Sequence, residues 1–146
     1  MDIQDILGEA ILSGQSDAII AADKEGMIVF WNPGAERIFG YSSGEAVGRS
    51  LDIIIPARLR ERHWDGYRRV MHSGESRYGH GDILAVPGIA KDGRDLSLEF
   101  TIVPLRTRTG QLIGLAAVMR DVTKRFKELS ALKRKLAEMI SKPGSQ

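Results

Sequence analysis

Apolar and polar residues alternate with two different periods along this chain. Residues 2–12 repeat apolar side chains every three or four positions, which predicts a short amphipathic helix. Residues 18–23 and 27–31 are short apolar runs on either side of the turn KEG, so they predict a β-hairpin. The pair Asn32-Pro33 then predicts the start of a short helix, and Gly40 predicts its end.

Residues 41–73 favour helical turns over strands. The segment 41–51 contains two glycines that separate short turns, and residues 51–56 form a brief apolar stretch closed by a proline. Residues 57–73 follow as the strongest internal helix candidate. All helices of the central region are therefore expected to precede the long strands.

Long strands are expected in the last third of the chain. Residues 82–90 and 95–106 flank the turn signal KDG, and alternation in the second segment predicts one buried face. Residues 111–122 predict another strand, and Pro87 restricts its own strand to an edge or a bulge. From Thr123 to about Ile140, apolar spacings of three and four predict an exit helix with an irregular coiled-coil stripe.

This order of elements predicts an α+β fold. Two strands before the helices and three after them make a five-stranded antiparallel sheet with short helices on one face. We expect four segments: an N-terminal amphipathic helix (1–13), a central domain (14–123), a coiled-coil-like C-terminal helix (124–140) and a tail (141–146). Exposed apolar stripes on the two terminal helices predict a homodimer formed through them.

Composition excludes several kinds of chemistry. The 146 residues include no cysteine, which rules out disulfides, thiolate zinc sites, cysteine nucleophiles and flavin–cysteinyl bonds. No apolar run reaches the roughly 18 residues of a membrane helix, and no signal-peptide pattern is present, so we expect a cytoplasmic protein away from membranes. We also expect no enzyme and no zinc site, because no catalytic set is convincing and neither His72 nor His80 has a second ligand at a suitable spacing.

The charge is distributed unevenly between the two parts of the chain. Residues 1–48 hold eight acidic and two basic side chains, and the remainder holds eleven acidic and nineteen basic ones. A basic half can indicate nucleic-acid binding. Here the arginines are scattered over several predicted elements without interleaved aromatic residues. We therefore expect no nucleic-acid binding by this domain.

Several motifs resemble the PAS family over about residues 14–124. The segment WNPGAERIFGY resembles the turn after the second strand of these domains, and DVTKR resembles the signature between the last strand and a signalling helix. The resemblance implies a sensory module, usually attached to a kinase, a cyclase or a transcription factor. It places a signal relay at Arg120 and Asp121, whose simpler role is a surface ion pair. A ligand-free dimerisation module is the alternative function.

His63 is the main candidate for a ligand-binding side chain. At about 100° per residue it lies in the centre of the apolar stripe of helix 57–73, and the arginines lie on the opposite side. A neutral imidazole that faces a cavity can bind a metal or a ligand. The simpler interpretation is a packed histidine that is hydrogen-bonded to a backbone carbonyl.

The segment RHWDGYRRV resembles the corresponding helix of the haem-binding PAS domains of rhizobial oxygen-sensor kinases. This resemblance implies haem b as the leading cofactor, with His63 as the ligand of its iron. It also implies an apolar cofactor pocket lined by strand residues, namely Leu84, Phe100, Ile102 and Ala117.

Two positions depart from those haem domains. Leu84 stands where the oxygen sensors carry an arginine that faces the bound gas, and Trp64 replaces a small acidic residue beside His63. Met119 shares a strand face with Ala117, so it can serve as a second iron ligand or as ordinary core packing. The identity of the cofactor stays open, because a small aromatic metabolite, a fatty acid or a flavin needs the same kind of cavity.

Overall fold

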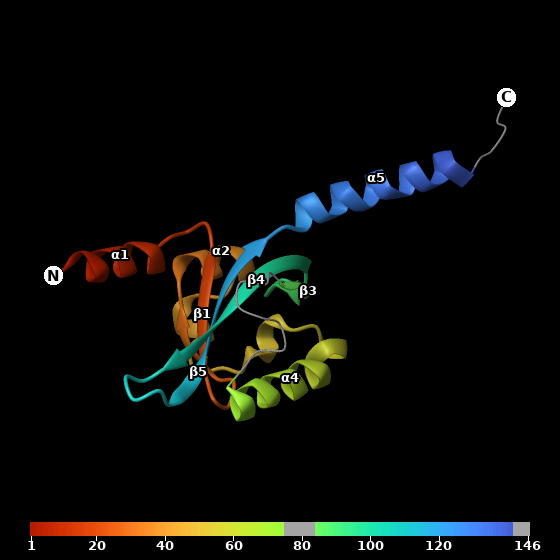
Figure 1. Ribbon diagram of the computed structural model, residues 1–146. Coiled ribbons are helices and arrows are strands. Elements are labelled where there is room, and N and C mark those ends of the chain that lie inside the picture. The colour runs from red at the N-terminus through yellow and green to blue at the C-terminus, as the bar shows by residue number, and fades with distance from the viewer. Residues whose placement is uncertain (75–83, 142–146) are drawn as a thin grey trace.

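One antiparallel sheet organises the molecule, with its strands in the order β2-β1-β5-β4-β3 (Figure 1). The computed structural model describes residues 1–74 and 84–141. The strands are β1 (Ala18–Asp23), β2 (Ile28–Trp31), β3 (Leu84–Ile89), β4 (Asp95–Arg106) and β5 (Leu112–Asp121). The five-stranded antiparallel sheet predicted from the sequence is confirmed, and Pro87 lies on an edge strand as expected.

Tight turns fix the pairing of neighbouring strands. Between β1 and β2, the Asp23 carboxylate accepts backbone hydrogen bonds from Glu25 and Met27, both at 3.0 Å. Gly26 completes this turn with a φ of +79°, a conformation that a glycine adopts without strain. The central pair, β1 and β5, then aligns Ala18 with Met119.

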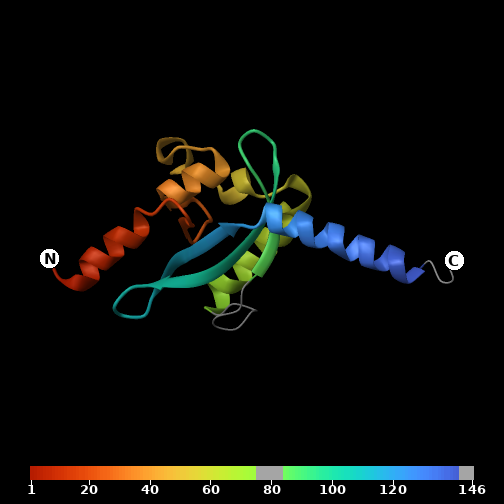
Figure 2. The same cartoon turned by 90° about the horizontal axis from the view of Figure 1, so that it is seen from above.

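The terminal helices, α1 (Ile3–Leu12) and α5 (Thr123–Ser141), leave the sheet in opposite directions (Figures 1 and 2). Neither helix has a buried residue in its described length. Apolar side chains such as Leu7 in α1 and Leu132 in α5 are more than half exposed. The apolar stripes of the sequence are therefore present and largely exposed, and Phe126 and Leu129 near the start of α5 border a hollow against β3 and β4.

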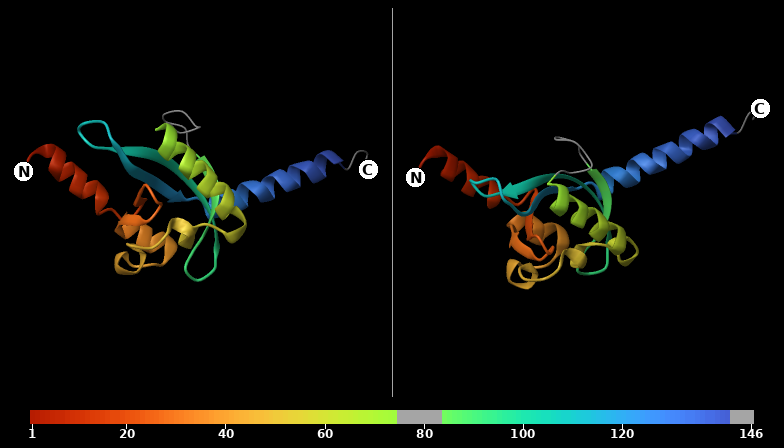
Figure 3. Two further views of the ribbon diagram at one scale, coloured as in Figure 1. Left: turned by 90° about the horizontal axis from the view of Figure 1, so that it is seen from below. Right: turned by 60° about the horizontal axis from the view of Figure 1, so that its bottom comes forward.

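The remaining helices cover one face of the sheet (Figure 3). They are α2 (Pro33–Phe39), α3 (Ser43–Ala46), the 3-10 helices η1 (Leu51–Ile54) and η2 (Ala57–Leu59), and α4 (Arg60–Ser73). The helix expected over residues 57–73 is thus divided, because its first turn is a 3-10 turn. The brief apolar stretch before it also forms a 3-10 helix.

Asn32 joins β2 to α2 from a buried position. Its Oδ1 accepts hydrogen bonds from the backbone N–H groups of Ile19 (2.8 Å) and Ala35 (2.9 Å). Its Nδ2 donates to the carbonyls of Asp17 (3.0 Å) and Gly14 (3.2 Å). One side chain therefore caps α2 and also holds the segment that leads into β1.

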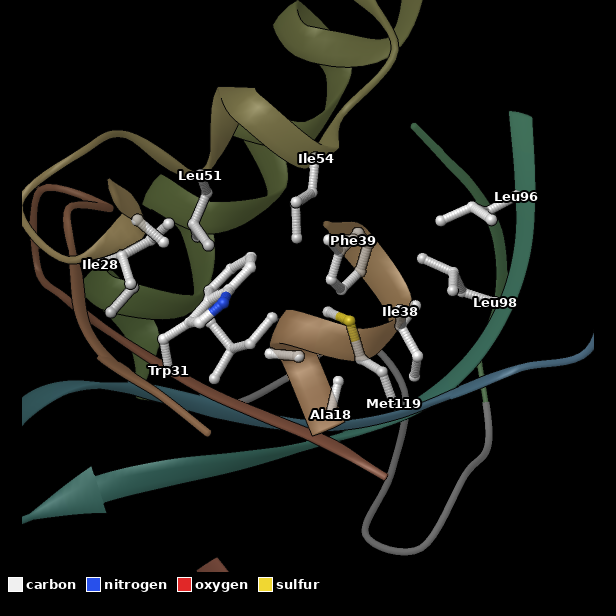
Figure 4. Close-up of a cluster of buried hydrophobic side chains, with 14 of the residues drawn as sticks. Ala18, Ile28, Trp31, Ile38, Phe39, Leu51, Ile54, Leu96, Leu98 and Met119 are labelled. Carbon is white, nitrogen blue, oxygen red and sulfur yellow. The ribbon is translucent and has the colours of Figure 1, made fainter. Parts of the chain in front are cut away.

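Buried hydrophobic side chains gather where β1 and β2 meet α2 (Figure 4). Trp31, Ile38 and Phe39 are each at most 3% exposed. The Trp31 and Phe39 rings lie 5.6 Å apart between centroids, and the indole N–H of Trp31 donates to the Tyr41 carbonyl at 2.9 Å. Trp31 is therefore a core residue with its polar atom satisfied.

Candidate functional site

An apolar cavity of about 120 Å³ lies between α4 and the sheet. Its floor consists of inward-facing strand residues, which alternate along each strand because successive side chains point to opposite faces. Its opposite wall comes from η1 and α4. The lining includes Ile20, Ala22, Leu51, Ile54, His63, Tyr67, Leu98, Phe100, Ile102, Leu115, Ala117 and Met119.

Four of the five side chains predicted for a cofactor pocket surround this cavity. They are His63, Phe100, Ile102 and Ala117, and the last two are direct partners across β4 and β5. The backbone of Leu84 pairs with Phe100 at the edge of the sheet, but the Leu84 side chain lies outside the described part of the structure. That these five side chains bind a cofactor stays a prediction.

The other sequence candidates lie in different places. Met119 is only 8% exposed and lines the cavity, on the same face of β5 as Ala117. His72 is exposed in the last turn of α4, and His80 lies outside the described residues. Within residues 1–74 and 84–141, no group of three histidines or carboxylates could hold a metal ion.

The Nδ1 atom of His63 is buried, and it has no hydrogen-bond partner among the described residues. Burial lowers the pKa of this imidazole below its ordinary value of 6.5, and the Asp52 carboxylate opposes that shift. The ring is therefore neutral at pH 7, with one donor nitrogen and one acceptor nitrogen. The predicted alternative, a bond from the histidine to a backbone carbonyl, is not found at Nδ1 in this part of the chain.

Two aromatic side chains hold α4 over the cavity. The Trp64 ring meets His63 edge-to-face at 4.7 Å between centroids, and its indole N–H donates to the Asp52 carboxylate at 2.7 Å. The Tyr67 hydroxyl donates to the backbone carbonyl of Asp23. Burial raises the pKa of this phenol above its ordinary range, so the hydroxyl keeps its proton.

Residues that anchor α4 from other elements were not identified from the sequence. Asp52 belongs to η1 and Asp23 ends β1, so the two hydrogen bonds span 12 and 44 positions of the chain. Gly26 is also involved, because a Cβ added there would lie 2.0 Å from the Trp64 ring. The sequence indicated a turn at Gly26 but gave no signal for the helix that packs on it.

The side chains of the cavity fit haem better than its volume does. A neutral imidazole within apolar walls is a suitable environment for a haem iron. A volume of about 120 Å³ is, however, far below the roughly 300–1,000 Å³ of typical cofactor pockets. A porphyrin would require α4 to move, which breaks the hydrogen bonds of Trp64 and Tyr67. With α4 in the described position, the site does not fit the macrocycle.

The predicted relay residues have separate partners where β5 meets α5. Arg120 Nε lies 3.3 Å from a carboxylate oxygen of Asp17, and the Asp121 carboxylate accepts the Thr123 N–H at 3.0 Å. Thr123, which the sequence did not single out, accepts a hydrogen bond from the Ser97 N–H at 3.0 Å. The first turn of α5 is therefore tied to β4 as well as to β5.

Comparisons with known proteins identify the fold. The family model described as PAS fold matches residues 12–126. The sensor protein FixL of Bradyrhizobium diazoefficiens is 28% identical over 131 residues, which are 90% of this chain and 25% of that protein. The signal transduction histidine-protein kinase AtoS of Escherichia coli is 28% identical over 121 residues, which are 82% of this chain and 18% of the kinase.

A solved structure supports the same conclusion. The crystal structure of the PAS domain of a protein from Colwellia psychrerythraea superposes with a TM-score of 0.71 at 26% identity, covering 84% of this chain and 99% of that domain. The chain spans a quarter or less of the length of FixL and AtoS. No helix in the described part of the chain is long and apolar enough to cross a membrane. By its matched span and its sheet order, the chain belongs to the PAS fold family.

Proposed function

We propose that this chain is the sensory module of a signal-transduction protein and that its signal is a ligand bound beside His63. One observation carries the proposal, namely the buried Nδ1 of His63 without a partner in the described residues. Leaving such an atom unsatisfied costs about 1–3 kcal/mol. A ligand that forms this hydrogen bond recovers that free energy, so the cavity favours occupation by a molecule with one polar group.

The position of the cavity suggests how occupation reaches α5. Ala117 and Met119 line the cavity, and Arg120 and Asp121 follow directly on the same strand. Thr123 then links the start of α5 to β4. A ligand that shifts β5 relative to β4 changes these junction contacts, and typical couplings between two sites amount to about 1–3 kcal/mol. The proposed output is a kinase domain, in line with the names of the relatives, or a transcriptional domain.

A cavity-filling variant tests this relay without a known ligand. Ala117→Leu adds bulk inside the cavity, and Val118→Leu adds bulk at the next position of β5, which does not line the cavity. We expect amide hydrogen exchange at residues 123–126 to change in Ala117→Leu and to stay as in the wild type in Val118→Leu. Identical exchange in all three proteins would contradict the relay.

Haem b is the leading cofactor candidate, because α4 resembles the haem-binding helix and the neutral, half-buried His63 lines the cavity. Bound haem supplies an iron that can bind a gas. The residues that would hold it are His63 and the apolar strand residues of the cavity. No step of the relay depends on haem, because the cavity volume of about 120 Å³ is too small for the macrocycle.

A hemin titration followed by visible absorption tests the haem prediction. A Soret band at one haem per chain that is lost in His63→Ala and kept in His72→Ala would establish His63 as the iron ligand. His72 is the matched control, because it is an exposed histidine of the same helix. Hemin binding that is indifferent to His63→Ala would exclude this role.

A ligand-free dimerisation module is the second candidate function. It is favoured by the exposed apolar side chains of α1 and α5, for example Ile3 at 74% and Leu136 at 57% exposure. Apolar stripes of this kind normally bury against a partner. Analytical ultracentrifugation is expected to show a homodimer, and a strict monomer at high concentration would count against it.

A further inference from the structure

The volume of the cavity restricts the size of its ligand. An apolar cavity of about 150 Å³ in another protein binds benzene. The cavity beneath α4 measures about 120 Å³, which matches one six-membered ring. With α4 held by the hydrogen bonds of Trp64 and Tyr67, the space beneath the helix is too small to bury a whole flavin or a long fatty acid. This space therefore suits a small molecule with a single ring.

The side chain of His63 restricts the chemistry of the ligand. His63 lines the cavity, and its Nδ1 is the one buried side-chain nitrogen or oxygen without a partner in the described residues. The remaining lining is almost entirely hydrocarbon, so a charged carboxylate or amine would be costly to bury. A neutral hydroxyl group can donate or accept a hydrogen bond, so it suits either tautomer of the imidazole. One neutral hydroxyl satisfies the site.

The aromatic lining favours an aromatic ring over an aliphatic one. Tyr67 and Phe100 line the cavity from opposite walls, and the Tyr67 ring lies 5.8 Å from the His63 ring between centroids. Aromatic pairs at such distances gain from edge-to-face and tilted contacts beyond the burial of their surface. An aliphatic alcohol of equal size lacks this contribution.

We propose that the cavity binds a small neutral phenol, with the ring between α4 and the sheet and the hydroxyl bonded to Nδ1 of His63. This inference rests on the proposed function and names the chemical class of its ligand. It differs from the haem prediction because it requires no movement of α4.

Three probes separate the contributions of the hydroxyl and the ring. Phenol, toluene and cyclohexanol are titrated into the full chain, and the backbone amide signals of residues 63, 117 and 119 are followed by NMR. Phenol is expected to bind one per chain, about tenfold more tightly than toluene, because toluene leaves Nδ1 unpaired. Cyclohexanol, which has the hydroxyl without the aromatic ring, is expected to bind more weakly than phenol.

Two variants locate the hydroxyl. In His63→Leu, phenol is expected to bind no more tightly than toluene, whereas in His72→Leu the tenfold preference is expected to remain. Thermal unfolding shows whether each variant is folded. The comparison of phenol with toluene in the wild type needs no variant, so it tests the inference even where a substitution prevents folding.

Each contrary result has a separate meaning. Equal affinity for phenol and toluene would overturn the inference while leaving an apolar ligand site. Hemin binding through His63 without any phenol binding would also overturn it, and the proposed sensory function would stand. The failure of all probes, together with unchanged exchange at α5 in Ala117→Leu, would overturn both the inference and the proposed function.

Discussion

The two ends of the helical face of the sheet differ in how they are filled. At the α2 end, Trp31, Ile38 and Phe39 are almost completely buried (Figure 4). The Asn32 side chain at this end has four hydrogen bonds. At the α4 end, Tyr67 is the one buried residue of the helix, and a cavity remains beneath it. The α2 end is closely packed and stabilises the fold. The α4 end is less completely packed, which leaves space between the helix and the sheet.

The largest expected effect is at the filled end. Asn32→Ala removes the partner of four backbone groups, and we expect the free energy of unfolding to fall by about 3–5 kcal/mol. Urea denaturation measures this loss. Gln15→Ala, at an exposed polar residue near Asn32, is expected to change stability by less than about 0.5 kcal/mol. A small loss in Asn32→Ala would contradict the structural role given to this residue.

Two phenylalanines compare the ends directly. Phe39→Ala creates a hole in a fully packed region and is expected to cost about 3–5 kcal/mol. Phe100→Ala enlarges an existing cavity at a half-buried position, so we expect a cost of only about 1–2 kcal/mol. Chemical denaturation of the two variants under the same conditions tests the comparison. Equal losses would mean that the α4 end is packed as tightly as the α2 end.

Added bulk is expected to follow the same order, with the larger loss of stability at the α2 end. Ala35 is fully buried, so Ala35→Leu is expected to destabilise the protein by about 1–3 kcal/mol or more. Ala117 faces the cavity, and Ala117→Leu is expected to change stability by less than about 1 kcal/mol in either direction. Thermal unfolding provides the measurement. A severe loss in Ala117→Leu would show that the cavity cannot accept another side chain.

The smallest expected effect is the pH dependence of the α4 end. The folded-state pKa of His63 is lowered, so the unfolded chain binds the proton more readily. The free energy of unfolding is therefore expected to decrease as the pH falls below about 6.5. His63→Leu should reduce this slope between pH 7.5 and pH 5, whereas His72→Ala should keep it. An unchanged slope in His63→Leu would mean that folding does not lower the pKa of His63.

Most helices and strands could be predicted from regular patterns in the sequence. The alternation of Leu96, Leu98, Phe100 and Ile102 predicted the bounds and the buried face of β4 correctly. Asn32 and Gly40 predicted the ends of α2, because both residues act within one turn of the helix. The 3-10 helix η1 was not specified, since a short apolar run has no clear period.

The site could be predicted only in its local parts. The helical position of His63 and the strand parity of Ile102 and Ala117 placed these side chains on surfaces that face each other. The anchors Asp23 and Asp52 contact α4 through long-range bonds, which leave no local pattern in the sequence. The cavity volume depends on how close α4 lies to the sheet, and those anchors determine that distance.

The opposite directions of α1 and α5 have a mechanical consequence. Both helices connect to the sheet at one end of the antiparallel β1–β5 pair, where Ala18 lies opposite Met119. A pulling force between the helices would therefore load the hydrogen bonds of this pair one after another, starting at that end, and would not shear them together. Met119 also lines the cavity. A bound molecule would thus touch the first rung that tension between the two helices reaches.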